Sequence, residues 1–286
     1  VRRSSPSEMK IAKSIGAVRS WRMSNSARVV LVPTMGALHD GHAALIRSAR
    51  KLAGTRGRVV VSIFVNPIQF GPKEDFSSYP RPLRRDLAVC RSAGADAVFV
   101  PSAEEMYDAD RSIAIEESSL SRALCGRSRP GHFNGVCTVV AKLFLIVQPT
   151  HAVFGEKDWQ QLAVLRRMVR DLNFPVAVIG HPTIRETDGL AISSRNAYLT
   201  ASERSLAPAI QAGLRSATLK KTPYAIESSA KKSLSAIPGA RLDYVEAVEA
   251  DTLQPLKNRK RAGRLAAAVF LGKARLIDNI PLPILP

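Results

Sequence analysis

Apolar residues along the first two thirds of the chain gather in short, uninterrupted runs of strand length. Val29–Val32, Arg58–Val65 and Ala97–Val100 are such runs, and a helical pattern follows each of the first two. Two further runs lie at His151–Gly155 and Pro175–Ile179. Continuous apolar runs are typical of strands that are buried on both faces, and strands that alternate with helices favour a parallel sheet. The pattern therefore predicts an α/β fold built around a parallel sheet.

The pattern changes after Pro182, where the polar, loop-like segment Thr183–Asn196 begins. Two helical patterns and three strand patterns follow, at residues 202–219, 224–237, Leu242–Val248, Leu265–Leu271 and Ala274–Ile280. The strand Leu242–Val248 alternates in polarity, as expected for a sheet with one wet face. We expect a smaller α+β domain after a boundary near residue 182, so that the two domains span residues 1–182 and 183–286.

The amino-terminal residues show no signal peptide, and an organellar transit peptide, for which the segment is very short, stays open. Val1–Pro6 is basic but lacks the apolar core of a signal peptide, and no apolar run in the chain reaches transmembrane length. Lys10–Arg22 places Ile11, Ile15 and Val18 on one side of a short amphipathic helix. These features predict a cytoplasmic protein.

Composition and cysteine usage indicate a globular protein without disulfide bonds. Of its 286 residues, 45% are hydrophobic and 23% are charged, which is typical of a globular protein with a sizeable core. The three cysteines, Cys90, Cys125 and Cys137, show no ligand-like spacing. Neither a disulfide framework nor a zinc site is expected.

The formal net charge of +18 leaves a nucleic-acid-binding protein open as an alternative class, because clustered lysines and arginines neutralise phosphates. One dense basic cluster lies between Lys257 and Arg264. It contains no aromatic residues for base stacking, and we interpret it as a solvated loop. We expect the charge to attract anionic substrates instead, and a nucleic-acid partner is not expected.

The most informative segment is the turn Met35–His42, between the strand Val29–Val32 and the next helical pattern. Open α/β sheets bind ligands at the carboxyl ends of their parallel strands, and a helix N-terminus favours phosphate. His39 and His42 stand where such phosphates would lie, and an imidazole there can stabilise charge on phosphorus and on a departing pyrophosphate. Two solvent-facing histidines beside a helix cap are the alternative. The strand and the Gly36 turn favour the nucleotide site.

Later segments offer further groups that suit an anionic ligand. Gly155–Asp158 forms a second strand–turn–helix unit, in which the glycine permits close backbone approach and Lys157 is a point charge suited to a phosphate oxygen. Ser193–Arg195 supplies two hydroxyls and a guanidinium that can bind phosphate with two parallel hydrogen bonds. Gln69 follows the second strand, where an amide suits hydroxyl and carboxylate recognition. The residues by themselves favour an ordinary loop amide at this position.

Taken together, these segments resemble a known family. The turn resembles the HIGH-type signature of adenylate-forming nucleotidyltransferases, and the chain from about Ala27 to Ile280 is similar to the pantoate–β-alanine ligases (pantothenate synthetases). The similar blocks occur in the same order and are Pro33–His42, Ser62–Gly71, Tyr79–Arg81, Arg129–Val136, Phe154–Gln161, Arg185–Tyr198 and Leu276–Asn279. Several blocks in order are far more specific than any one of them.

The resemblance implies a fold and an activity. The family has a Rossmann-like amino-terminal domain and a smaller carboxyl-terminal domain that closes on the nucleotide as a lid, and it usually forms homodimers. The implied reaction is the ATP-dependent condensation of (R)-pantoate with β-alanine through a pantoyl adenylate, with release of AMP and pyrophosphate and a requirement for Mg²⁺.

The resemblance also implies roles for particular residues. His42, His39, Lys157 and Arg195 would be catalytic. The residues implied to contact ATP are Met35, Gly36, Ala37, Leu38, His39, Asp40, Gly41, His42, Gly155, Glu156, Lys157, Asp158, Ile184, Ile192, Ser193, Ser194 and Arg195. Gln69 would contact pantoate and β-alanine, and Gln161 would contact pantoate. Arg84 and Arg85 stand where acidic residues are usual, so Asp86 is the only metal ligand carried over.

Two other readings of the residues stay open. One is a different HIGH-type enzyme, either a nucleotidyltransferase with a phosphorylated substrate or a fragment of an aminoacyl-tRNA synthetase. Gln69 and Gln161 argue against a phosphorylated substrate, since arginine or lysine would be expected to meet its phosphate. Chain length argues against a synthetase fragment. The other reading is a non-catalytic nucleic-acid-binding protein on a Rossmann-like fold.

Overall fold

The computed structural model describes residues 8–25, 27–72 and 74–285, and it divides by internal contacts into two compact units. The first unit comprises residues 1–116, 131–155 and 165–181, and the second comprises residues 117–130, 156–164 and 182–286. Pro182 thus begins the longest part of the second unit, and two earlier segments join it. The division into domains at residue 182 stays a prediction. The internal contacts group two earlier segments, residues 117–130 and 156–164, with the part that begins at Pro182.

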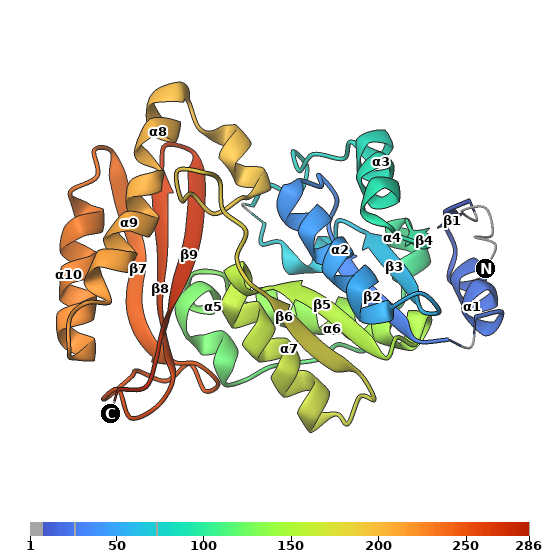
Figure 1. Cartoon of the computed structure of the whole chain (residues 1–286). Coiled ribbons are helices and arrows are strands. Elements are labelled where there is room, and N and C mark those ends of the chain that lie inside the picture. The colour runs from blue at the N-terminus through green and yellow to red at the C-terminus, as the bar shows by residue number, and fades with distance from the viewer. Residues whose placement is uncertain (1–7, 26, 73, 286) are drawn as a thin grey trace. The chain divides into compact units, whose positions relative to one another are not determined.

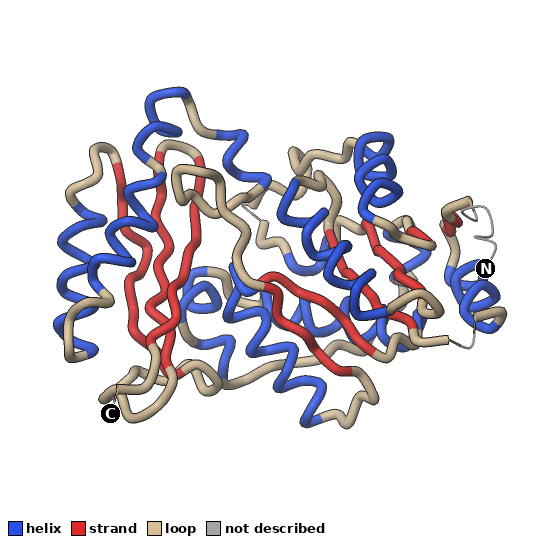
Figure 2. The backbone as a smooth tube through the Cα atoms, viewed as in Figure 1, coloured by secondary structure: helices blue, strands red, loops and turns tan. Residues whose placement is uncertain are grey.

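The first unit is a parallel sheet with helices on both sides (Figures 1 and 2). Its strands are β1 (Lys10–Ala12), β2 (Val29–Thr34), β3 (Arg58–Ile63), β4 (Ala97–Phe99), β5 (His151–Gly155) and β6 (Ala177–His181). They lie in the order β1-β4-β3-β2-β5-β6, and every pairing is parallel. The helices of this part are α1 (Ile15–Met23), α2 (Asp40–Ala53), α3 (Leu83–Ala93), α4 (Ala103–Met106) and α6 (His132–Val147), with a short 3-10 helix, η1 (Pro67–Gln69).

The core of this unit forms where the apolar runs predicted it. Val30 and Val32 of β2 and Val59 and Val61 of β3 are fully or almost fully buried, and they pack with Ile46 of α2. α2 packs with α3, and α6 packs with α1, while both α2 and α6 contact β2. Because helices cover the sheet on both faces, its strands can be apolar on every side. The structure confirms the α/β parallel-sheet prediction.

The strand order predicts where along this sheet a ligand binds. The direction in which successive strands are added reverses between β2 and β5. From β2 the chain adds β3 and β4 on one side of the sheet, and it then returns to add β5 and β6 on the other side. In open α/β sheets, ligands bind beyond the carboxyl ends of the strands at such a reversal. Thr34 and Gly155 end these two strands, so the segments that follow them are the expected ligand-binding loops.

The second unit is built on a three-stranded antiparallel sheet of β7 (Ala240–Glu249), β8 (Gly263–Leu271) and β9 (Ala274–Leu282). α9 (Pro208–Ala217) and α10 (Pro223–Ser235) pack on this sheet, with Leu214, Ile226 and Leu234 buried against it. The remaining elements that lie wholly or partly in this unit are η2 (Leu120–Arg122), α5 (Leu124–Ser128), η3 (Glu156–Asp158), α7 (Trp159–Asp171), η4 (Ser194–Tyr198) and α8 (Ala201–Leu206). The predicted smaller α+β part is therefore present.

One local prediction is wrong, and a second holds only in part. Lys10–Arg22 is not one helix, because Lys10–Ala12 pairs in parallel with Ala97–Phe99 and only Ile15–Met23 is helical. The expected wet face of the carboxyl-terminal sheet is present only in part: consecutive β8 residues from Leu265 to Val269 are all buried, whereas Arg241 of β7 is exposed and Glu246 is partly exposed. α5 contacts β7 and β8, and η3 contacts β9. The alternating polarity of one strand had suggested that this face of the sheet is solvated. Part of it is covered by α5 and η3, which are remote in sequence.

The basic cluster is only in part the solvated loop that the sequence predicted. Arg259 is only 8% exposed, and its guanidinium donates to the Pro283 carbonyl. Arg261 pairs with Glu249, and Arg264 pairs with Glu156. Arg259 and Arg264 are therefore used inside the fold, whereas Lys257, Lys260 and Arg261 are exposed, as expected of a solvated loop. None of the helices that the structure describes is both long and apolar enough to cross a bilayer.

Candidate active site

The turn after β2 is held by a buried carboxylate from α3. Gly36 and Ala37 have φ values of +85° and +50°, so two successive residues adopt the left-handed region. Asp86 accepts hydrogen bonds from the backbone N–H groups of Ala37 at 2.9 Å and Leu38 at 2.7 Å. A Cβ at Gly36 would lie 3.0 Å from an Asp86 oxygen and 3.2 Å from the Ile63 side chain. Glycine is required there both by conformation and by space.

The two histidines lie together at the start of α2. Helix α2 begins at Asp40, and His39 is its extended N-cap residue. The His39 N–H donates to His42 Nδ1 at 3.4 Å, and the centroids of the two rings lie 4.1 Å apart. Because Nδ1 accepts this bond, neutral His42 carries its proton on Nε2. The histidine pair therefore acts as a helix cap and also holds a ring N–H donor at a helix N-terminus, so the two readings of the sequence are compatible.

A chain of side-chain hydrogen bonds leads from this turn into the loop after β3. Gln69 is 8% exposed, its Nε2 donates to Met35 Sδ at 2.9 Å, and its Oε1 accepts from Asn66 Nδ2 at 3.0 Å. Asn66 Nδ2 also donates to the Gly135 carbonyl at 3.1 Å, and its Oδ1 accepts from the Tyr107 hydroxyl at 2.8 Å. A hydroxyl and a backbone carbonyl thus fix the orientation of Asn66, and Asn66 fixes the orientation of Gln69.

The first turn of α6 closes the other side of Gln69. His132 Nδ1 lies 2.8 Å from the Gln69 carbonyl oxygen. A Cβ at Gly135 would overlap the Ile68 carbonyl and the Gln69 Cα, so the helix can approach the loop only because this residue is glycine. The contribution of Tyr107 was missed from the sequence, because its segment is polar and irregular and carries no pattern that points to Asn66.

In the second unit, the turn η3 is anchored by Asn279 of β9. Asn279 Nδ2 donates to the Glu156 carbonyl at 2.9 Å and to the Lys157 carbonyl at 3.1 Å. Its Oδ1 accepts from Arg264 Nη1 at 3.1 Å. Arginine can only donate, so the assignment of oxygen and nitrogen in this amide is determined. The backbone that carries Lys157 is therefore fixed by a side chain more than a hundred residues away.

Arg264 connects several parts of the same region. Its Nη2 donates to the Glu156 carboxylate at 2.9 Å, and its guanidinium lies 3.6 Å from the centroid of the Trp159 ring. The Trp159 indole in turn donates to the Ala250 carbonyl at 2.9 Å. Glu156 is implied by the family resemblance to contact ATP, and in this structure its side chain is occupied by Arg264.

A small hairpin, residues 184–192, precedes Ser193–Arg195 and is hydrogen-bonded to strand β9. Arg185 and Ala191 form an isolated antiparallel bridge, and Ile192 N–H donates to the Ile184 carbonyl at 3.0 Å. Arg185 donates through both terminal nitrogens to Asp278, at 2.7 and 2.9 Å. Beyond the hairpin, the Ser193 hydroxyl accepts the Arg195 N–H at 3.2 Å and caps η4.

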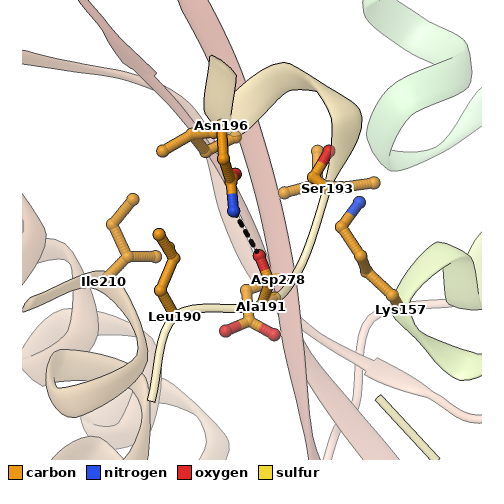
Figure 3. Close-up of a pocket in the computed structure, with 9 residues that line it drawn as sticks. Lys157, Leu190, Ala191, Ser193, Asn196, Ile210 and Asp278 are labelled. Carbon is orange, nitrogen blue, oxygen red and sulfur yellow. Dashed lines mark hydrogen bonds between the residues drawn. The ribbon is translucent and has the colours of Figure 1, made fainter. Parts of the chain in front are cut away.

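Residues of η3, the 190–193 segment, η4, α9 and β9 line a small pocket (Figure 3). Its lining residues are Lys157, Leu190, Ala191, Ser193, Asn196, Ile210, Leu276, Ile277 and Asp278. The Lys157 side chain extends toward Ser193, and Asn196 donates to the Ala191 carbonyl at 3.1 Å (Figure 3). The structure therefore brings together two implied phosphate-binding groups, Lys157 and Ser193, which the sequence separates by helix α7 and strand β6.

The remaining implied residues are less constrained. Gln161 is half-buried in the first turns of α7, whereas its neighbour Gln160 is buried and donates to the carbonyls of Leu120 and Ala123. Asp158 is exposed at the end of η3, and Ser194 begins η4.

A metal-holding role for Asp86 has no support in this geometry, because both of its oxygens accept backbone N–H groups. Within residues 8–25, 27–72 and 74–285, no three His, Cys, Asp or Glu side chains are grouped so that they could hold a metal ion.

A glycine turn beside a helix N-terminus at the switch point of a parallel sheet is the geometry of a nucleotide-binding α/β protein. Comparison with known proteins identifies the family. The family model described as pantoate-beta-alanine ligase matches residues 9–281. The chain belongs to the pantoate–β-alanine ligase family.

The similarity extends over nearly the whole chain. The pantothenate synthetase of Akkermansia muciniphila is 55% identical over 258 residues, which cover 89% of this chain and 92% of that protein. A crystal structure of pantothenate synthetase from Thermus thermophilus is 43% identical, with a TM-score of 0.88 over 96% of this chain and all of that one (100%). The Francisella tularensis ligase, solved in complex with "Beta-gamma ATP and Beta-alanine", is 36% identical, with a TM-score of 0.79 over 95% of this chain and 97% of that one. The chain is accordingly a ligase that forms pantothenate from pantoate and β-alanine, which selects one of the classes that the sequence had left open.

Proposed function

We propose that the enzyme forms pantothenate in two steps, and that the Met35–His42 turn and the Lys157–Ser193 pocket both act on ATP. In the first step a carboxylate oxygen of (R)-pantoate attacks the α-phosphorus of ATP and pyrophosphate leaves, which gives pantoyl adenylate. In the second step the amine of β-alanine attacks the acyl carbon, and AMP leaves with the electrons of the acyl–oxygen bond. The contact that best supports this proposal is the hydrogen bond between Gln69 and Met35 at 2.9 Å, because it joins the implied pantoate-binding amide directly to the implied phosphate-binding turn.

The first step needs positioning and charge stabilisation more than covalent chemistry. His42 would donate its Nε2 proton to a phosphate oxygen, supported by the N-terminus of α2. His39 would orient His42 through the backbone bond at 3.4 Å. Lys157 and Arg195 would carry the charge of the departing pyrophosphate, with Ser193 and Ser194 as hydroxyl partners. The family resemblance supports the remaining ATP contacts: Gly36, Ala37, Leu38, Asp40, Gly41, Gly155, Glu156, Asp158, Ile184 and Ile192.

Pantoate recognition would rest on the amide network around Gln69. Because Asn66 and Met35 engage both ends of the Gln69 amide, that amide is presented in one orientation before any substrate arrives. Such preorganisation lowers the entropy that binding must overcome. Gln161 would supply a second amide to pantoate, and β-alanine would enter beside Gln69.

Mg²⁺ belongs to this proposal as the counter-ion of the nucleotide. Mg²⁺ commonly binds through substrate phosphates and retains several waters, so a cage of protein ligands is not needed. The described residues provide no carboxylate cluster for it, and Asp86 is engaged by the turn. We therefore assign no protein ligand to the metal and derive no step from it. Bound with ATP, it would neutralise phosphate charge.

Assembly, location and closure are also part of the proposal, and the family resemblance supports them. The enzyme would be a cytoplasmic homodimer whose carboxyl-terminal lid, residues 183–286, closes when ATP binds. Closure would exclude water from the reactive acyl adenylate. Light scattering on the purified chain would determine the oligomeric state.

The decisive experiment for the two-step route measures AMP and pyrophosphate separately. With ATP and pantoate alone, pyrophosphate should appear in an amount stoichiometric with enzyme, while AMP release should stay low. Addition of β-alanine should start continuous AMP release. Formation of ADP, or AMP release that requires β-alanine but not pantoate, would overturn the proposal.

A further inference from the structure

We propose that Asn279 is a positioning residue for adenylate formation. Together with its neighbour Asp278, it fixes the position of η3, which carries Lys157, relative to the segment that carries Ser193–Arg195. The inference rests on the function proposed above. It assigns to a pair of residues on β9 a role that is carried entirely through Lys157 and the Ser193–Arg195 segment.

The first observation is that these two adjacent residues serve two different segments. Asn279 holds η3 through the carbonyls of Glu156 and Lys157, whereas Asp278 holds the Arg185 hairpin. Successive side chains of a strand point to opposite faces, so neighbouring positions can reach two separate segments. Asp278 and Asn279 are 5% and 4% exposed, so both sets of bonds are shielded from water.

The second observation is that the pair is itself rigidly held. Both residues lie in the β8–β9 ladder, with Asp278 opposite Ala267 and Asn279 opposite Ala266. Asp278 Oδ1 also accepts the Asn279 N–H at 2.7 Å, and Arg264 fixes the Asn279 amide through its oxygen. A clamp held in a β-ladder and by buried hydrogen bonds transmits little motion, which is what positioning within a fraction of an ångström requires.

The third observation is where the positioned groups lie. Lys157 and Ser193 line the same pocket, and the Lys157 side chain extends toward Ser193 (Figure 3). If η3 shifted along β9 while the hairpin stayed in place, the ammonium and the hydroxyl would no longer meet one phosphate group together. A misplacement of about 1 Å can lower a rate about 10²-fold even when it starts far from the chemistry.

The test uses Asn279→Ala in the full chain and measures the two half-reactions separately. Adenylate formation is followed as pyrophosphate release, and the second step is followed as AMP release from synthetic pantoyl adenylate with β-alanine. We expect Asn279→Ala to slow adenylate formation by about 10- to 100-fold, mainly in kcat, and to leave the second step within about twofold. Ile226→Val is the control variant, since it trims a buried side chain on α10, a helix that packs on α9, β7 and β8. It should leave both half-reactions unchanged.

A double variant shows whether the effect runs through Lys157. Interacting residues give non-additive effects, so Asn279→Ala should have little further effect on adenylate formation in a Lys157→Ala background. The inference is overturned if Asn279→Ala slows both half-reactions equally, slows neither, or acts additively with Lys157→Ala. If the unmutated protein releases no pyrophosphate from ATP and pantoate, the proposed function has failed instead, and this result is distinct from all three.

Discussion

The Asp86 carboxylate accepts the Leu38 N–H at 2.7 Å across 48 positions of sequence, and its second oxygen accepts the Ala37 N–H. Asp86 is fully buried. The carboxylate therefore satisfies two backbone donors that would otherwise be stranded in a turn with two positive φ angles. It determines the shape of the loop that we propose cradles the phosphates of ATP.

Asp86→Ala is expected to lower the free energy of unfolding by on the order of 3 kcal/mol, since each hydrogen bond to a charged group contributes roughly 1.5–3 kcal/mol. Urea denaturation measures this, and the KM for ATP should rise. Arg84→Ala, an exposed change on the same helix, is the matched control and should stay within about 0.5 kcal/mol. Recovery of Asp86→Asn activity by excess Mg²⁺ would show that the carboxylate holds the metal.

Tyr107→Phe removes the hydroxyl that orients Asn66. Burial raises the pKa of Tyr107, so the hydroxyl stays protonated and donating throughout the neutral range. Loss of one neutral hydrogen bond, worth about 0.5–1.5 kcal/mol, should raise the pantoate KM by roughly two- to tenfold and leave the ATP KM unchanged. Tyr224→Phe, at a side chain that is 83% exposed, serves as the control. An unchanged pantoate KM in Tyr107→Phe would disconnect Asn66 from substrate binding.

His42→Ala should fold and should lose about 10²–10³ in kcat for adenylate formation, the usual effect of removing one donor to a developing oxyanion. His42→Gln separates catalysis from capping. Glutamine at the third helical position can accept the N-cap N–H in place of His42 Nδ1. Thermal stability should therefore recover in His42→Gln while kcat stays low. Near-normal turnover in either variant would leave His42 with a capping role alone.

Gln161→Ala and Gln160→Ala form a matched pair on α7. Gln161→Ala should raise the pantoate KM by roughly two- to tenfold without a change in the ATP KM. Gln160→Ala should lower stability by about 1–3 kcal/mol, since two hydrogen bonds to buried carbonyls are lost, and should leave the pantoate KM unchanged. Steady-state kinetics and urea denaturation measure the two effects. A raised ATP KM with normal pantoate binding in Gln161→Ala would contradict the assigned role.

Arg195→Ala should impair adenylate formation. It should also abolish the protection that ATP gives to residues 185–198 against a protease. Arg195→Lys should recover only part of the activity, because the ammonium cannot form two parallel bonds to a phosphate. Limited proteolysis with and without ATP, followed by mass spectrometry, reports on the segment. Equal cleavage of the unmutated enzyme in both conditions would show that lid closure does not protect it.

The sequence by itself determined the parts of this protein that depend on local physics. Long apolar runs such as Val29–Val32 and Arg58–Val65 can be stable only as strands covered on both faces, so the parallel sheet was predictable. The Met35–His42 turn was recognisable because glycines, histidines and a helix start occur together within a few residues. Its similarity to a family then supplied the activity, which the family comparison confirmed.

Tertiary structure decided the contacts that join residues far apart in the chain. No local pattern could indicate that Asp86 holds the Leu38 backbone, that Tyr107 orients Asn66, or that Asn279 anchors Lys157. Such bonds form because buried polar groups must find partners wherever the fold brings them. For the same reason Lys10–Ala12 is a strand, since the β4 ladder satisfies its backbone. Local periodicity indicates which faces will be buried, and only the assembled fold determines which side chains meet there.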